Sequence, residues 1–292
     1  MNKTIKNISL CTAFVSLMSC GESTKTSNEI PADSVKVNSV SEAELGSKLY
    51  NIPSPIETFT ILKMSGAEFD KTLLNSPKNI SKYVSNFSKS VNLGTYSADL
   101  SFCLLYKENA DINLYLKNVN ELTTSLGIDG GFAKAVTERL KANPNDSDSI
   151  MQIVSEASVD AYLYLKENQR NNTSVLITAG GWIEGMHFIT NMANKTQNKE
   201  VIGLVAGQRK VVRNLIKMLE KFESESEVAA LLTDIREIGA IYDTLKPKQD
   251  VAVASADKNI VSIGSNKSYE VSDEELKAIH EKIEALRNKL TI

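Results

Sequence analysis

Apolar residues recur at alternating three- and four-residue steps in the last third of the chain. One uninterrupted series consists of Val228, Leu231, Ile235, Ile238, Tyr242 and Leu245. A second follows a capping box from Ser272 to Glu275 and consists of Leu276, Ile279, Ile283, Leu286 and Leu290. Residues at this spacing form one stripe of an α-helix, and the stripe must be buried against another helix. We therefore predict an all-α fold, a multi-helix antiparallel bundle.

A third series is interrupted only at Gln208 and consists of Val205, Val212, Leu215, Leu219 and Phe222. Earlier in the chain, Ser54 followed by Pro55 predicts the start of a helix. Further helices are expected over residues 81–107, 111–126 and 131–142, and from Asp146 or Asp148 to residue 167. The segment 173–193 is apolar nearly all round, which predicts a central, buried helix. It also contains Glu184 and His187, so it is not the continuous apolar stretch that a transmembrane helix needs.

Helical periodicity stops over residues 246–271. Two short β-branched runs there, 251–253 and 260–263, predict short strands that could form a β-hairpin. The terminal helix is expected over 272–292. We interpret residues 52–292 as a single helical domain.

The N-terminal segment has the parts of a secretory signal. Lys3 and Lys6 precede an apolar run over residues 8–18, which is too short to span a bilayer. The run ends in Leu17-Met18-Ser19-Cys20, which resembles the lipobox of bacterial lipoproteins. The sequence thus predicts a signal peptide over 1–19 and an acylated Cys20. An ordinary signal peptide cleaved near Ser19, with an incidental cysteine, is the alternative.

Residues 20–51 are rich in Ser, Thr, Glu, Lys and Asn, which is typical of a flexible tether. The expected location is the cell envelope, with the chain held by its lipid on a membrane. We expect the outer membrane, with the domain facing the periplasm or the cell surface. Cys103 is the one cysteine left after the anchor, so no intramolecular disulfide is expected. Its apolar helical surroundings predict a buried, inert thiol.

The charge balance argues against nucleic acid as a partner. The chain has 33 basic and 36 acidic residues, for a net charge of −3. Removing residues 1–19 takes away two lysines and no acid, so the remaining chain is more acidic still. Arg209, Arg213 and Lys217 repeat every four residues along one helix side, which we interpret as a solvated face. An anionic ligand or partner is the alternative.

Two stretches, 92–100 and 179–187, carry features that core filling alone does not require. The second holds Gly180, Gly181 and Gly185, although glycine inside a helix costs up to ~1 kcal/mol relative to alanine. Close approach of two helix backbones would explain these glycines. Room for a ligand is the other explanation.

The candidate site residues in these stretches are Tyr96, Asp99, Trp182 and Glu184. Glu184 lies on an apolar face, and an unpaired buried charge costs several kcal/mol. It therefore needs a partner such as a tyrosine hydroxyl, an indole N–H or an arginine. We interpret the four residues as a structural polar network. The alternative is that they line a small-molecule pocket.

No catalytic or cofactor motif is found. Glu184 and His187 have the Glu-x-x-His spacing of di-iron bundles, which need two such motifs. The other histidine, His280, is preceded three residues earlier by Lys277, so the second motif is missing. We predict no metal, no cofactor and no catalytic residues, and expect a protein that is not an enzyme.

The two stretches resemble a family of uncharacterised helical lipoproteins from Bacteroidota. The resemblance rests on residues 91–96 and 98–100, and on residues 179–185. It covers about residues 52–245 and includes residues 126–128 and 53–55. In that family an aromatic residue is usual where His187 stands. The resemblance implies an envelope location and a helical fold, but no activity.

The leading hypothesis is therefore a membrane-anchored lipoprotein with a non-enzymatic binding or envelope-structural role. Its protein or small-molecule partner is unknown. The alternative is a ligand-binding or sensory lipoprotein with a pocket between the glycine-containing helices.

Overall fold

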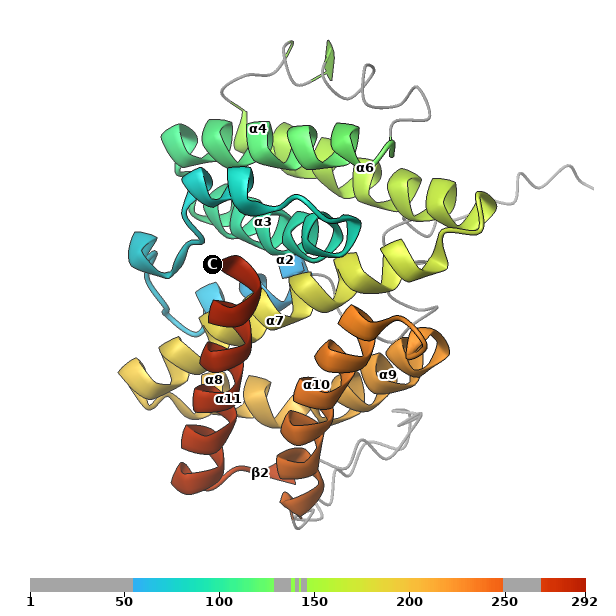
Figure 1. Cartoon of the computed structure of the whole chain (residues 1–292). Helices are drawn as coiled ribbons and strands as arrows, with labels where there is room; N and C mark the ends of the chain where they lie inside the picture. Colours follow the sequence, from blue (N-terminus) through green and yellow to red (C-terminus); the bar gives the residue numbers. More distant parts are fainter. Residues whose placement is uncertain (1–54, 129–137, 140–141, 143–145, 249–268) are drawn as a thin grey trace, which may run out of the picture. The chain divides into compact units, whose positions relative to one another are not determined.

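The longest helix in the described part of the chain, α7 (Asn171–Thr196), lies at the centre of the fold. It is buried along most of its length and contacts helices from both ends of the chain. The computed structural model describes residues 55–128, 138–139, 142, 146–248 and 269–292 (Figure 1). All of them belong to one compact unit within residues 39–292.

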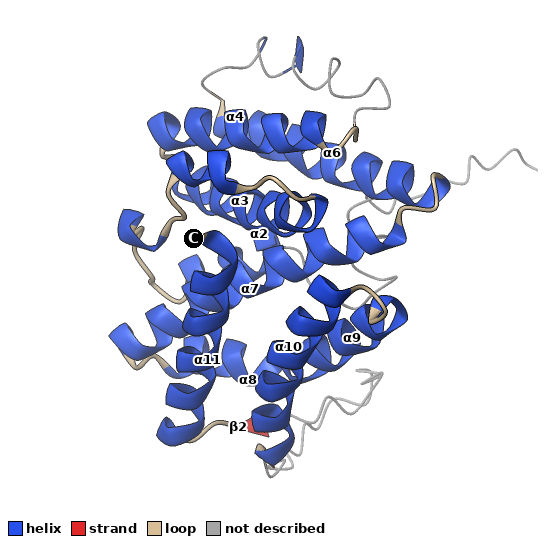
Figure 2. Cartoon of the chain, in the orientation of Figure 1, coloured by secondary structure: helices blue, strands red, loops and turns tan. Residues whose placement is uncertain are grey.

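The described residues form nine α-helices and a two-stranded sheet (Figure 2). Before α7 these helices are α2 (Pro55–Met64), α3 (Asn86–Tyr106), α4 (Asn109–Ser125) and α6 (Ser147–Glu167). After it come α8 (Lys199–Gly207), α9 (Arg209–Leu219), α10 (Ser226–Thr244) and α11 (Asp273–Thr291). Three 3₁₀ turns are η1 (Lys71–Leu73), η2 (Pro77–Lys82) and η3 (Glu220–Phe222). The predicted all-α class is confirmed.

Helix α3 packs between α7 on one side and α4 and α6 on the other. Helix α7 in turn separates α3 from a group formed by α8, α9 and α10 (Figure 1). The last helix, α11, packs on α7 and α10 and also touches α3. The C-terminal helix is thus part of the central packing.

Capping side chains set several helix starts close to the predicted positions. Asp146 accepts hydrogen bonds from the backbone of residues 148 and 149 at the start of α6. Ser272 and Glu275 form the predicted capping box of α11. Gly127, with φ of +62°, follows α4 in the left-handed conformation that glycine tolerates.

Two predicted helix boundaries are wrong. Helix α3 begins at Asn86 rather than at residue 81, because Ser85 and Ser88 form a capping box and residues 77–82 form the separate turn η2. The series from 205 to 222 is also not one helix. At Gln208 the backbone N–H bonds to the carbonyl of Val205 in a tighter turn, which ends α8 and starts α9. The series then ends in the 3₁₀ turn η3.

The predicted strands 251–253 and 260–263 lie outside the described residues, as do Cys20 and most of the predicted helix 131–142. The strands that are described flank that region. Strand β1 (Lys246–Pro247) pairs in antiparallel fashion with β2 (Tyr269–Glu270). Of the described helices, none is both long enough and apolar enough to cross a membrane.

Aromatic rings connect α2, α3 and α7 in the core. Phe102 stacks on Phe188 with ring centroids 4.3 Å apart, and Phe59 meets both rings edge-on. Cys103 is fully buried and unbonded, as its surroundings predict. Burial raises the pKa of its thiol far above the usual range.

The crossing of α3 and α7 brings two backbones into direct contact at two glycines. A Cβ atom at Gly94 would lie 2.0 Å from the carbonyl oxygen of Ile177, and one at Gly180 would lie 1.9 Å from that of Val91. Both distances are far below van der Waals contact. At these two positions the glycines serve close helix approach, whereas a Cβ at Gly185 would meet nothing within 4 Å.

Replacing Gly94 or Gly180 with alanine is expected to lower the free energy of unfolding by about 3 kcal/mol or more, because the helices must separate to admit the methyl group. Gly185→Ala is the matched control in the same helix. It should raise the stability by up to about 1 kcal/mol through better helix propensity. Urea denaturation of the three variants checks this. Equal effects at positions 180 and 185 would contradict the contact.

Candidate functional site

A buried ion pair joins the central helix to the C-terminal helix. Glu184 in α7 is fully buried, and the side chain of Arg287 in α11 is 12% exposed. Arg287 donates two hydrogen bonds of 2.7 Å, from Nε to Oε2 and from Nη2 to Oε1 of Glu184. This two-bond geometry is the strongest that an arginine and a carboxylate can form. Of the partners considered for Glu184, arginine is the one found.

The pair belongs to a ladder of polar contacts between α7 and α11, which we call the α7–α11 ladder. Its three rungs are Glu184–Arg287, His187–Glu284 and Thr190–His280. Positions 184, 187 and 190 are three residues apart and therefore share one side of α7. Positions 287, 284 and 280 share one side of α11 and run the other way. The ladder thus fixes the register of two antiparallel helices.

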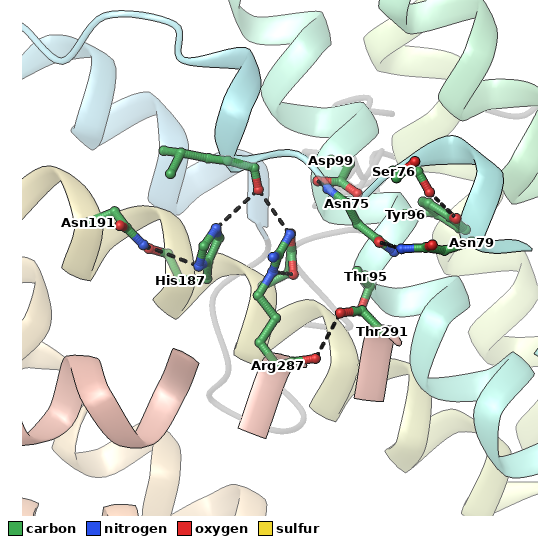
Figure 3. A network of polar contacts seen from close by, with 12 residues as sticks. Asn75, Ser76, Asn79, Thr95, Tyr96, Asp99, His187, Asn191, Arg287 and Thr291 are labelled. Carbon is green, nitrogen blue, oxygen red and sulfur yellow. Dashed lines mark hydrogen bonds and ion pairs between the residues drawn. The ribbon is translucent and has the colours of Figure 1, made fainter. Parts of the chain in front are cut away.

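The carbonyl of Leu73, at the end of η1, receives hydrogen bonds from two rungs of the ladder. Nη2 of Arg287 lies 2.9 Å from this oxygen and Nε2 of His187 lies 3.0 Å from it (Figure 3). Since a carbonyl oxygen only accepts, both nitrogens are donors. The other ring nitrogen of His187 contacts the carboxylate of Glu284. Burial alone would raise the pKa of Glu284, but its contact with His187 holds that pKa below the usual range.

Asp99 lies beside the Glu184–Arg287 pair and is itself fully buried. Its Oδ1 accepts the backbone N–H of Asn75 over 3.4 Å, and its Oδ2 has no hydrogen-bond partner among the described residues. Burial first, and the nearby Glu184 carboxyl second, raise the pKa of Asp99 well above its usual range. The raised pKa favours the neutral form of this carboxyl, which avoids an uncompensated buried charge.

Residues 70–83 pass over this network and are held by hydrogen bonds to their backbone. Tyr96 donates to the carbonyl of Ser76 over 2.9 Å, which places this predicted residue at the edge of the network (Figure 3). Two further donations come from α4: Tyr115 to Asn75 O and Asn118 to Pro77 O, over 2.8 and 2.9 Å.

The end of α11 is held in the same way. The hydroxyl of Tyr83 donates to the carbonyl of Thr291 over 3.1 Å, and the amide of Asn92 donates to the carbonyl of Leu290 over 2.9 Å. These acceptors are terminal carbonyls that have no partner within a helix. Side chains from α3 and from the segment before it therefore cap the C-terminal helix.

Trp182 is not part of this arrangement. Its indole N–H donates to Oε1 of Gln208 over 3.2 Å, at the junction of α8 and α9. The structure therefore brings Asp99 and Glu184 together, places Tyr96 nearby and directs Trp182 to a different contact. Within the described part of the chain, no three histidine, cysteine or acidic side chains are placed to hold a metal ion.

Sequence reasoning missed Thr190 in α7, and in α11 it missed Arg287 and Glu284. The latter two lie three residues apart beside the apolar series of α11, and His280 lies four residues before Glu284. The sequence alone therefore shows a polar stripe along one side of this helix. It does not by itself identify the partner helix.

Scans against models of protein families, curated proteins and solved structures find no match to this chain.

Arg287→Ala is expected to lower the free energy of unfolding by about 3–5 kcal/mol, because it leaves the buried Glu184 carboxylate without its partner. Lys289→Ala is the matched control in the same helix, since Lys289 forms an exposed ion pair with Asp234. Its effect should be small. Chemical denaturation of both variants measures the difference, and a mild Arg287→Ala variant would show that Glu184 does not depend on the arginine.

The raised pKa of Asp99 predicts a pH-dependent stability. Between its unfolded-chain pKa near 3.8 and its higher folded-state pKa, Asp99 takes up a proton when the chain folds. Its contribution to the free energy of unfolding is therefore complete below the first pKa and is lost as the pH rises through the second. The slope between these limits is up to about 1.4 kcal/mol per pH unit. Asp99→Asn removes this titration. The variant should gain stability relative to the wild type as the pH rises, and parallel curves from urea denaturation across the pH range would refute the assignment.

Proposed function

We propose that this protein is a lipid-anchored envelope protein whose helical domain acts without catalysis, as a binding or structural module. The anchor is assigned to Cys20 and the location to a bacterial cell envelope. The support is the sequence order of a basic start, an apolar run and the Leu17-Met18-Ser19-Cys20 tetrapeptide. The resemblance to Bacteroidota lipoproteins agrees with this assignment.

The observation that supports a non-catalytic role is the closed polar network. A catalytic acid, base or nucleophile must reach a substrate. In the described residues, the carboxylate of Glu184 pairs with Arg287. The two ring nitrogens of His187 contact the carboxylate of Glu284 and the carbonyl of Leu73. These contacts are internal, and Glu184 and His187 are buried.

The same contacts also support a structural role for the domain. The α7–α11 ladder, the capped end of α11 and the α3–α7 crossing join segments far apart in the sequence. A rigid domain of this kind suits a protein that holds a partner or occupies a fixed place in the envelope. Cys103 does not offer a reactive thiol, since it is buried and its pKa is raised.

Replacing Cys20 with serine should release the protein from the membrane fraction, because the acyl chains would supply the membrane affinity. Cell fractionation with immunoblotting measures the distribution. Mass spectrometry of the wild-type protein should find its mature N-terminus at an acylated Cys20. Cys103→Ser is the control and should stay in the membrane fraction. An unmodified Cys20, or residues 1–19 retained in cells, would contradict the proposal.

A further inference from the structure

A surface cleft lies where α6 ends, α7 begins and α9 passes into η3. Its volume is about 450 Å³, and it is lined by Lys166, Asn171, Val175, Met218, Lys221 and Phe222. This volume falls in the ~300–1,000 Å³ range of sites for small organic molecules. None of the residues of the α7–α11 ladder lines it.

The lining divides into an apolar part and a cationic part. Val175 and Met218 are largely buried, and with Phe222 they form the apolar part. The ammonium groups of Lys166 and Lys221 come from different elements, α6 and η3. No acidic residue lines the cleft.

The two lysines have no ion-pair partner among the residues that the structure describes. Two of the acids in the neighbouring segment are paired with an arginine, and a third is hydrogen-bonded to a neutral amide. Glu220 and Glu223 pair with Arg236, and Glu225 accepts a hydrogen bond from Asn172. The cleft therefore combines an apolar lining with two lysines that form no ion pair with a described residue.

We propose that this cleft binds a single-chain amphiphilic anion. The carboxylate or phosphate head would lie between Lys166 and Lys221, with the Asn171 amide as a further donor, and the apolar chain would lie against Val175, Met218 and Phe222. An ammonium group binds such heads as a point charge. The proposal goes beyond the lipid anchor, since the cleft is built from the helical domain alone.

Isothermal titration of the whole chain with decanoate tests the proposal. The chain should carry Cys20→Ser and be purified without detergent, so that no other amphiphile competes. Decanoate should bind, and the double variant Lys166→Gln/Lys221→Gln should bind it at least about 10-fold more weakly. The control Lys199→Gln/Lys210→Gln removes the same charge from exposed positions of α8 and α9 that do not line the cleft. It should change the affinity less than about 2-fold, because distant exposed charges are screened.

Further probes separate the head from the chain and the free molecule from a membrane. Decyl phosphate should bind like decanoate, whereas decanol and inorganic phosphate should each bind much more weakly. The proposal is overturned if neither decanoate nor decyl phosphate binds, or if both double variants weaken binding equally. It is also overturned if the chain binds phosphatidylglycerol vesicles through Lys166 and Lys221 but binds no monomeric amphiphile.

Discussion

The pairing of Glu184 with Arg287 is the interaction on which the centre of this protein depends. A carboxylate with no solvent exposure is costly unless an opposite charge and hydrogen bonds compensate it. The partner lies 103 residues further along the chain. The C-terminal helix must therefore dock before the buried charge of Glu184 is compensated. The other two rungs of the ladder then set how far α11 slides along α7. Burial of one acid thus determines the register of a helix pair.

The glycine contacts of α3 and α7 determine where that acid meets its neighbours. Gly94 and Gly180 allow the two backbones to touch, and Asp99 and Glu184 follow them by five and four residues, about one helical turn. Close crossing therefore brings two fully buried carboxyl groups together. Burial and the neighbouring acid both raise the pKa of Asp99, which favours its neutral form. A steric feature of the backbone in this way shifts the pKa of a side chain.

Sequence reasoning predicted the helical class, most helix positions and the need of Glu184 for a partner, because periodicity and capping residues are local signals. It placed the start of α3 too early, because it did not recognise the capping box that Ser85 and Ser88 form at the start of this helix. It also joined α8 and α9, because their apolar series continue across Gln208. Arg287 was missed for another reason. A polar stripe beside an apolar series looks like a solvent-facing edge until the helix that it contacts is known.

The position of α11 at the end of the described residues has a consequence for biogenesis. During synthesis at ~5–20 residues per second, Glu184 leaves the ribosome roughly 5–20 seconds before Arg287 follows it. Throughout that interval Glu184 lacks this partner, so burial of its charge is unfavourable. The core around α7 therefore closes only after α11 has been made.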